Sequence, residues 1–379
     1  MQHIVHILEA TTGGTRRHLR DLVTGLDPHL FRQTLIVATR RDPDFVNDLE
    51  LYRARGIRVE VVDMRRSPAP LKDFTALRRI TGLLREMAPD IVHTHSSKAG
   101  IVGRLAARRA GVPRLIHTPH VFAYEMQAPA PARLAALLLE RLVSRWTHRL
   151  ICVSEAEARA ARRLGPACPP LEIIRNGIAV PSEPPAAPHF ETPLRFALIG
   201  RLCRQKGQDI LARALLAHSE LARTHRFEFV GIPTGQDLPD FVSTAAVSGL
   251  CHILPPLAPD EMEQYLQEVD VVVMPSRWEG LPYTLLEAMA QSRSIVAANV
   301  GGVSEVVRQA VNGLLVEGEE PAAWAAALRE IVNDPAAARR RARAGFETVA
   351  TEFKLETMLQ KLTAVYQAEA TAAQANGNK

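Results

Sequence analysis

The chain has 379 residues, 47% apolar and 23% charged, a composition typical of a globular protein that excludes a wholly disordered chain. Its length exceeds the size at which one hydrophobic core usually stops growing, so we expect two domains. The formal net charge of the chain is +5. Residues 1–190 contain 28 Lys and Arg against 18 Asp and Glu, a net charge of +10, and the remainder has a net charge of −5. The basic half favours an anionic partner.

The first residues resemble a strand running into a glycine turn rather than a signal peptide, because no basic segment precedes a long apolar run. The longest apolar run, LAALLLE at 134–140, is too short to span a bilayer. We therefore expect a cytoplasmic protein. Four cysteines without CxxC spacing predict reduced thiols rather than disulfides or a zinc site: Cys152, Cys168, Cys203 and Cys251.

Short β-branched runs, each followed by a longer amphipathic segment, recur through the first half of the chain. They are HIVHIL (3–8), TLIVAT (34–39), VEVVDM (59–64), DIVHTH (90–95), RLIHTP (114–119), RLICVS (149–154) and LEIIRN (171–176). This pattern predicts alternating strands and helices.

After a Pro-rich stretch the alternation restarts with RFALIG (195–200), RFEFVG (226–231), CHILPP (251–256), DVVVMP (270–275), SIVAAN (294–299) and NGLLV (312–316). Nearly continuous apolar strands predict parallel sheets covered on both faces, so we expect an α/β protein of two Rossmann-like domains facing each other across a cleft. The boundaries we expect are a first domain at 1–180, a linker at 181–193, a second domain at 194–370 and a flexible tail at 371–379. The helices after residue 320 are expected to cover the second sheet.

Four features of the first half could carry chemistry. Gly13 and Gly14 follow the first strand and permit close approach of a ligand, although the GxGxxG pattern is absent. His120 follows a strand end. His93 and His95 lie on one face of another strand end, but no third ligand has recognisable spacing, and Asp42 and Asp44 form a DxD typical of a polar loop. We therefore predict no metal site.

The second half carries the stronger pattern. In GRLCRQKG, Gly200 ends a strand, and Arg201 and Lys206 precede a helix, as suits a diphosphate. In SRWEGLPYTLLEAMA, Pro282 suits the first turn of a helix, which would direct amides toward an anion. Glu279 would lie before this turn and Glu287 within the helix. This arrangement places one glutamate on each side of a bound diphosphate.

These residues resemble a known family, the retaining glycosyltransferases of family 4, which have the GT-B fold and act in bacterial polysaccharide or lipid-linked glycan assembly. The resemblance covers most of the chain. It rests on the glycine pair, HTHSSKAG (93–100), HTPH (117–120), GRLCRQKG (200–207) and the E-x7-E element from Glu279 to Glu287. It implies that the first domain binds the acceptor and the second the nucleotide-sugar donor.

The resemblance also implies a role for each matched residue. Arg201 and Lys206 would bind the donor diphosphate, Glu287 the ribose hydroxyls and Glu279 the hydroxyls of the sugar. His120 would lie near the sugar's C6 hydroxyl. Backbone contacts to the donor would come from Gly13, Gly14, Gly200, Gly280, Leu281, Tyr283 and Thr284.

Such a site stabilises the charge that develops on the departing nucleoside diphosphate, so no metal or other cofactor is required. Without an evident nucleophile opposite the donor, we expect same-face attack and a retained anomeric configuration. The alternatives are a non-hydrolysing nucleotide-sugar epimerase, a catalytically inactive nucleotide-sugar sensor and an NAD-binding module, the last lacking its glycine fingerprint. Nucleic-acid binding is not expected, because aromatic residues are only 5% and no recognition motif is present.

We expect a UDP-sugar donor, with GDP-mannose second, and a glycan or polyprenyl-linked acceptor. Segments 65–80, 103–111 and 132–146 mix basic and apolar residues at helical spacing. They predict peripheral docking on the anionic inner face of the cytoplasmic membrane.

Overall fold

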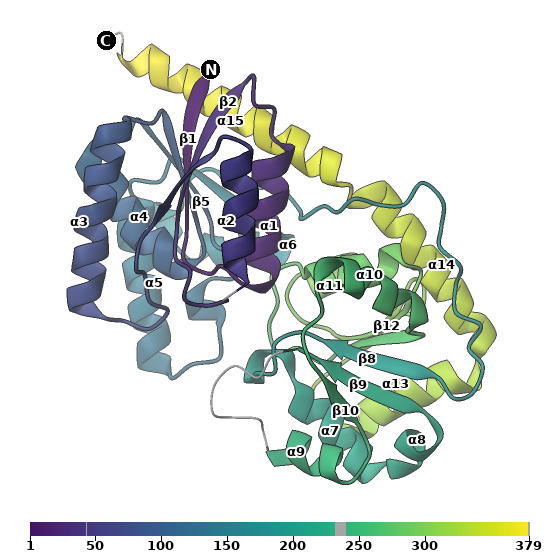
Figure 1. Cartoon of the computed structure of the whole chain (residues 1–379). Coiled ribbons are helices and arrows are strands. Elements are labelled where there is room, and N and C mark those ends of the chain that lie inside the picture. Colours follow the sequence, from purple (N-terminus) through teal and green to yellow (C-terminus); the bar gives the residue numbers. More distant parts are fainter. Residues whose placement is uncertain (43, 232–239, 378–379) are drawn as a thin grey trace. The chain divides into compact units, whose positions relative to one another are not determined.

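The computed structural model describes residues 1–42, 44–231 and 240–377, and the chain forms two compact units. The first comprises Met1–Asn176 together with the C-terminal segment from Glu356, and the second comprises Gly177–Leu355. Each is an α/β unit with a parallel sheet (Figure 1), which confirms the predicted fold class. Among the described residues, no helix is both long and apolar enough to cross a membrane.

The first unit contains a seven-stranded parallel sheet in the order β3-β2-β1-β4-β5-β6-β7. The strands are β1 (Gln2–Leu8), β2 (Phe31–Val37), β3 (Arg58–Val61), β4 (Ile91–His95), β5 (Arg114–Thr118), β6 (Arg149–Cys152) and β7 (Leu171–Ile173). The helices are α1 (Gly13–Gly25), α2 (Phe45–Ala54), α3 (Pro70–Met87), α4 (Ser97–Ala110), α5 (Ala130–Ser144), α6 (Glu155–Arg162) and α15 (Leu355–Gly377). Each predicted run of the first half overlaps one of these strands, although β1, β2 and β3 begin one to three residues before the predicted run.

Helices cover both faces of this sheet. Successive side chains of a strand point to opposite faces, so neighbouring residues contact different helices. Val5 and Val92 belong to the core cluster that includes residues of α3 and α4. Their neighbours His6 and His93 therefore face the other side, and strands β1 and β4 place these two histidines opposite each other in register. On that side the hydroxyl of Tyr366 in α15 lies 2.7 Å from His93 Nδ1.

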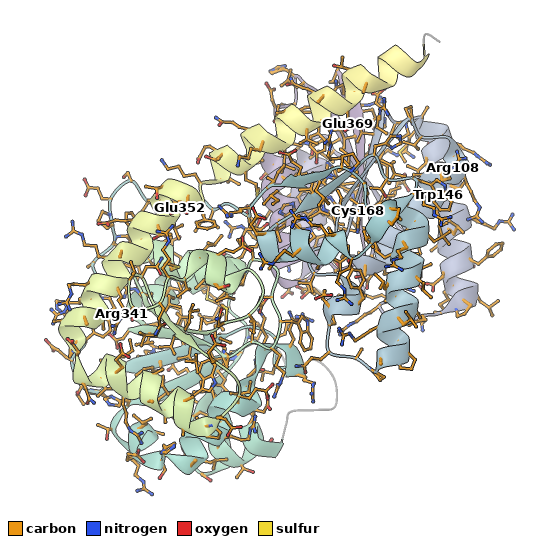
Figure 2. All side chains as sticks on the ribbon, turned by 180° about the vertical axis from the view of Figure 1, so that it is seen from behind. Arg108, Trp146, Cys168, Arg341, Glu352 and Glu369 are labelled. Atoms are coloured by element: carbon orange, nitrogen blue, oxygen red, sulfur yellow. The ribbon has the colours of Figure 1, made fainter. Side chains whose placement is uncertain are left out.

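The assignment of all late helices to the second sheet is corrected for α15. Besides Tyr366, this helix carries Glu369 (Figure 2), whose backbone oxygen accepts a hydrogen bond from Arg114 Nε at 3.1 Å and whose carboxylate pairs with Arg149 at 3.0 Å. Composition shows that a segment is helical, but only these contacts identify the sheet that it covers. The expected flexible tail is helical as far as Gly377, and residues 378–379 lie outside the described part.

The second unit contains a six-stranded parallel sheet in the order β10-β9-β8-β11-β12-β13. The strands are β8 (Arg195–Ile199), β9 (Arg226–Val230), β10 (His252–Leu254), β11 (Val271–Met274), β12 (Ser294–Ala298) and β13 (Leu314–Val316). The helices are α7 (Gln208–Ala217), α8 (Ser219–Thr224), α9 (Asp240–Val247), α10 (Pro259–Glu268), α11 (Tyr283–Ala290), α12 (Val303–Val306), α13 (Pro321–Asn333) and α14 (Pro335–Glu352). Within this unit, α7 and α13 contribute to the core on one face of the sheet, and α11 packs with α14.

The stretch at 181–193 has neither helix nor strand, but it is packed against the second unit rather than free of both units. Phe190 is 5% exposed within the core cluster of that unit, and the carbonyl of Ala186 accepts a hydrogen bond from Arg293. The chain instead passes between units after Asn176 and again after Leu355.

Each sheet reverses its strand order at one point, between β1 and β4 in the first unit and between β8 and β11 in the second. In open α/β sheets, ligands bind at the carboxyl ends of the strands beside such a reversal. The predicted site residues follow four strands, three of which (β1, β8 and β11) flank a reversal, while His120 follows β5.

Candidate functional site

In the second unit, two loops meet at the reversal between β8 and β11. The first loop runs from Gly200 through a single 3-10 turn, η3 (Arg204–Lys206), to Gly207, the N-cap residue of α7. Gly207 has φ +69°, and a Cβ there would overlap the carbonyl oxygen of Pro275, the residue that follows β11. Only glycine permits this approach. The contact between the loops explains why the GRLCRQKG motif ends in glycine.

Lys206 and Glu279 meet across these loops. Lys206 Nζ lies 2.6 Å from Glu279 Oε1, and Ser276 Oγ donates to the same oxygen at 2.8 Å. The two charged side chains are 15% and 8% exposed, so water screens their interaction only weakly. The sequence placed both residues at the site but did not predict their ion pair or the contribution of Ser276.

Arg201 is partly exposed and lies on the same loop as Lys206. Its Nη2 donates to Gln205 Oε1 at 3.2 Å, and Gln205 Nε2 donates to the carbonyl of Trp278 at 3.1 Å. Gln205 therefore fixes the Arg201 guanidinium relative to the loop that carries Glu279. Two cations and one carboxylate converge on this strand edge.

Helix α11 begins at Tyr283, and Pro282 is its N-cap residue rather than part of the first turn as predicted. The residues before and after the cap, Leu281 and Tyr283, are buried at 4% and 5% exposure. Within α11 only Thr284 and Glu287 are partly exposed, and their i, i+3 spacing places them on one face of the helix. A ligand at the helix N-terminus can reach both side chains.

Arg277 is a site residue that the sequence analysis missed. Its side chain is 6% exposed, and its guanidinium binds both carboxylate oxygens of Asp209 at 2.8 and 2.7 Å and Glu319 at 2.9 and 2.7 Å. Burial acts to raise the pKa of Asp209, but the hydrogen bonds and charge of Arg277 outweigh it and hold the pKa below its usual value. Arg277 thus ties the loop after β11 to α7 across a sequence separation that no local motif reveals.

In the first unit, Gly13 and Gly14 open α1 after β1. Both are exposed, and Gly13 has φ +56° with no atom within 4 Å of the position that a Cβ would occupy. The backbone here is accessible, as the glycine pair predicts. Asp42 of the DxD pairs with Arg16 at 2.8 Å, and Pro43 lies outside the described residues.

His120 lies in a strained loop after β5. His120 has φ +51° and Val121 has φ +89°, a conformation that is costly for a β-branched residue. The amide of Val121 donates to Glu157 Oε1 at 2.6 Å, and the amide of Val153 donates to Oε2 of the same carboxylate at 2.8 Å. Glu157 therefore holds the loop in the conformation that positions His120.

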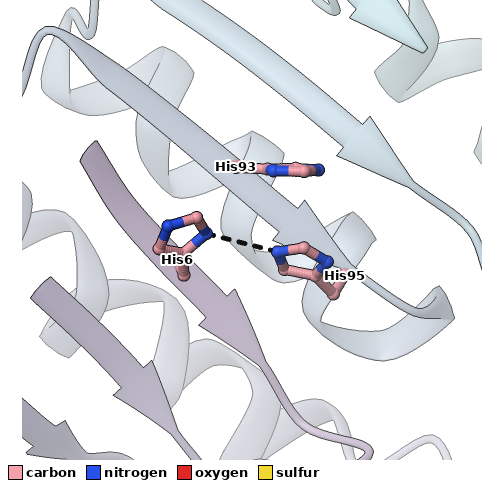
Figure 3. Close-up of side chains that lie close together, drawn as sticks. All are labelled: His6, His93 and His95. Atoms are coloured by element: carbon pink, nitrogen blue, oxygen red, sulfur yellow. Dashed lines mark hydrogen bonds between the residues drawn. The ribbon is translucent and has the colours of Figure 1, made fainter. Parts of the chain in front are cut away.

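Beside this loop the structure gathers five histidines, of which the sequence analysis had connected only His93 and His95. His6 Nδ1 lies 3.4 Å from His95 Nε2, and the rings of His93 and His95 are 4.0 Å apart (Figure 3). The ring of His18 in α1 lies 4.6 Å from that of His120. Burial lowers the pKa of all five, to about 3 for His6 and about 4 for His18, so the rings are neutral at pH 7.

Two protein families match this chain. The profile described as "Glycosyl transferase 4-like domain" covers residues 13–177, and that described as "Glycosyl transferases group 1" covers residues 193–334. The D-inositol 3-phosphate glycosyltransferase 1 of Catenulispora acidiphila is 33% identical over 80% of this chain and 77% of its own. An Escherichia coli enzyme named UDP-Gal:alpha-D-GlcNAc-diphosphoundecaprenol alpha-1,3-galactosyltransferase is 30% identical over 70% of this chain and 72% of its own.

Solved structures share the fold at lower identity. Sucrose-phosphate synthase from Thermosynechococcus elongatus has a TM-score of 0.81 at 20% identity, covering 98% of this chain and 100% of its own. Anabaena HepE, in complex with UDP and glucose, has a TM-score of 0.80 at 20% identity, covering 97% and 100%.

Proposed function

Because the chain belongs to glycosyltransferase family 4 and is a glycosyltransferase of the GT-B type, we propose that it moves a sugar from a UDP-sugar to a glycan or lipid-linked glycan. The observation that carries the proposal is the convergence of Arg201, Lys206 and Glu279 beside the N-terminus of α11 at one strand-order reversal. A UDP donor is favoured by the name of the galactosyltransferase relative, and GDP-mannose is the second candidate. Family membership favours a transferase over an epimerase.

The donor contacts follow from the groups at the reversal in the second unit. Arg201 and Lys206 bind the diphosphate, joined by amides of the segment from Gly280 to Thr284, while Gly200 leaves room for the Lys206 side chain. An ammonium group has three N–H donors, so Lys206 can bind a phosphate oxygen without releasing Glu279. Glu287, on the accessible face of α11, accepts hydrogen bonds from the ribose hydroxyls.

The sugar contacts use the remaining groups. Both described hydrogen bonds of Glu279 end on Oε1, and no described residue donates to Oε2, so Oε2 accepts from the sugar's hydroxyls. In the first unit, Gly13 and Gly14 offer backbone to the diphosphate, and His120 binds the hydroxyl at C6.

The transfer step breaks the bond between the anomeric carbon and the diphosphate oxygen, and forms a bond from that carbon to the acceptor hydroxyl oxygen. Charge develops on the leaving diphosphate, where Arg201, Lys206 and the α11 amides stabilise it without a metal ion. The acceptor's proton passes to the departing phosphate oxygen, which lies on the face of the sugar that the acceptor attacks. The anomeric configuration is therefore retained.

The donor proposal is tested by thermal unfolding with a panel of nucleotide sugars. A donor at one hundred times its Kd stabilises the protein by about 2.7 kcal/mol, while a sugar that does not bind has no effect. Lys206→Ala should reduce the shift, whereas Arg204→Ala, an exposed cation in the same loop, should leave it intact. The absence of stabilisation by every nucleotide sugar would refute the proposal, and analysis of the products would separate transfer from epimerisation or from binding alone.

We also propose that the first unit docks on an anionic membrane and meets a polyprenyl-linked acceptor there. Four leucines with 39–56% exposure lie along α5 at helical spacing: Leu134, Leu138, Leu139 and Leu142. Arg133, Arg141 and Arg145 are exposed on or just after this helix, and its only acidic residue, Glu140, is buried. Such a surface combines apolar insertion with attraction to anionic lipid.

The predicted membrane face included one basic residue that is not on the surface. Arg104 of the 103–111 segment is fully buried and pairs with Glu140 at 2.6 Å, so it cannot contact lipid. Sedimentation with anionic liposomes tests the remaining surface. Binding to the liposomes should weaken as the salt concentration rises, and also in Leu138→Glu. Binding that does not depend on salt or on anionic lipid would refute membrane docking and favour a soluble acceptor.

A further inference from the structure

Three histidines from three different elements bring ring nitrogens close together in the first unit. His18 comes from α1, His95 from the end of β4 and His120 from the loop after β5. One ring nitrogen of each lies within 4.8 Å of the other two. The ring centroids are 4.6, 5.7 and 5.8 Å apart, close to the roughly 5 Å expected for three imidazoles around one tetrahedral zinc ion with Zn–N bonds of about 2.0–2.1 Å.

We propose that His18, His95 and His120 form a binding site for a zinc-class divalent cation, with water as the fourth ligand. Neutral imidazoles are good ligands for zinc, and three of them with one open position form a common coordination set. Among the described residues, neither His95 Nδ1 nor His120 Nε2 has a hydrogen-bond partner, although both are buried. Burying a polar atom without a hydrogen-bond partner destabilises a fold, and coordination would remove that penalty for both nitrogens.

The hydrogen bonds around the three rings select compatible tautomers. His18 Nδ1 lies 3.2 Å from the side-chain oxygen of Asn176, which can only accept, so the proton is on Nδ1 and Nε2 carries the lone pair. When His95 Nε2 donates to His6 Nδ1, the lone pair of His95 is on Nδ1. Asn176 and His6 thus act as the outer partners that orient metal-binding histidines.

A second triad, His6, His93 and His95, is less suited to hold an ion (Figure 3). Both ring nitrogens of His93 are already engaged, Nδ1 with Tyr366 at 2.7 Å and Nε2 with Thr118 at 2.8 Å. Coordination there would break a buried hydrogen bond. At the proposed site, three Zn–N bonds of about 2.0–2.1 Å at tetrahedral angles require ligand nitrogens about 3.4 Å apart, and the present separations are at most 4.8 Å.

Binding of this ion would oppose the proposed transfer. The cation would coordinate the lone pair of His120 and fix its ring, so His120 could not bind the sugar hydroxyl. Zinc is therefore an inhibitor of an enzyme that needs no metal. This consequence depends on the proposed function, whereas the binding site itself does not.

The test is titration of the EDTA-stripped full chain with Co²⁺, followed by visible absorption, and with Zn²⁺ against a chromophoric chelator. We expect one ion per chain and the intense visible bands of tetrahedral Co²⁺. His18→Gln should weaken binding more than about 100-fold, because it removes a ligand rather than an outer partner. His29→Gln, at an exposed histidine of the same unit, should bind as the wild type does.

X-ray absorption at the zinc edge of the wild-type protein provides a test that does not depend on the folding of variants. Three imidazoles and one oxygen ligand would support the site. Failure to bind, equal affinities in His18→Gln and His29→Gln, or loss of binding in His6→Gln with retention in His18→Gln would overturn it. Zn²⁺ should also inhibit transfer, with recovery on adding EDTA.

Discussion

Replacement of Lys206 by alanine tests the centre of the proposed donor site. The substitution removes an ammonium that lies 2.6 Å from Glu279 and that we assign to the diphosphate. A hydrogen bond to a charged group contributes about 1.5–3 kcal/mol, so kcat/KM should fall about 10- to 150-fold. The assay is steady-state transfer from the donor that the thermal-shift panel identifies.

The same substitution should also destabilise the protein. It leaves the Glu279 carboxylate, 8% exposed, with Ser276 as its only described donor, at a cost of about 1–3 kcal/mol. For a unit of this size each kcal/mol lowers Tm by about 2–4 °C. Adding Glu279→Gln should recover much of this loss, because the uncompensated charge is removed.

The two variants and their combination form a double-mutant cycle. Residues in contact couple by about 0.5–3 kcal/mol, so the two changes in stability should not add. Arg204→Ala provides the control for loss of a cation from the same loop. Wild-type kcat/KM in Lys206→Ala would remove this residue from the site, and strictly additive stabilities would refute the ion pair.

Three further predictions follow from the geometry. Gly13→Ala should lower the free energy of unfolding in urea by about 1–2 kcal/mol. Gly207→Ala should lower it by more, because of the two positions only Gly207 would place the new Cβ against backbone, at Pro275. Equal losses would refute the contact. Glu157→Gln should lower kcat about tenfold with little change in donor KM, because one of its two backbone hydrogen bonds is lost and His120 moves. Lower stability with unchanged kcat would refute the role of Glu157 in positioning His120. Transfer should persist in excess EDTA, and a divalent-metal requirement would overturn the metal-free mechanism.

Local sequence was sufficient for most of the fold. Every β-branched run that was predicted as a strand overlaps one, because apolar β-branched residues between helical segments suit a parallel strand buried on both faces. The motifs also placed Gly200, Arg201 and Lys206 after one strand, and Glu279 and Glu287 after another. These features depend on residues close together in the chain, and so does the family resemblance, which the comparisons confirm.

Contacts between distant residues could not be predicted in this way. The sequence placed α15 on the second sheet, whereas Tyr366 bonds His93 across 273 positions. Arg277 likewise reaches Asp209 and Glu319, and Glu157 holds the loop of His120. A helix-forming composition or a lone charge is compatible with many partners, and burial selects among them only after the sheets have formed.

The histidine cluster shows most clearly which features the local sequence determines and which depend on tertiary contacts. By itself the sequence determined that His93 and His95 share one face of a strand, because side chains alternate along a strand with a period of two. Only the tertiary structure decided their surroundings, because the parallel register of β1 and β4 places His6 opposite His93 and the loop after β5 brings His120 beside His18. Strand register and helix packing are set by hydrophobic burial over the whole unit, and no local spacing records them.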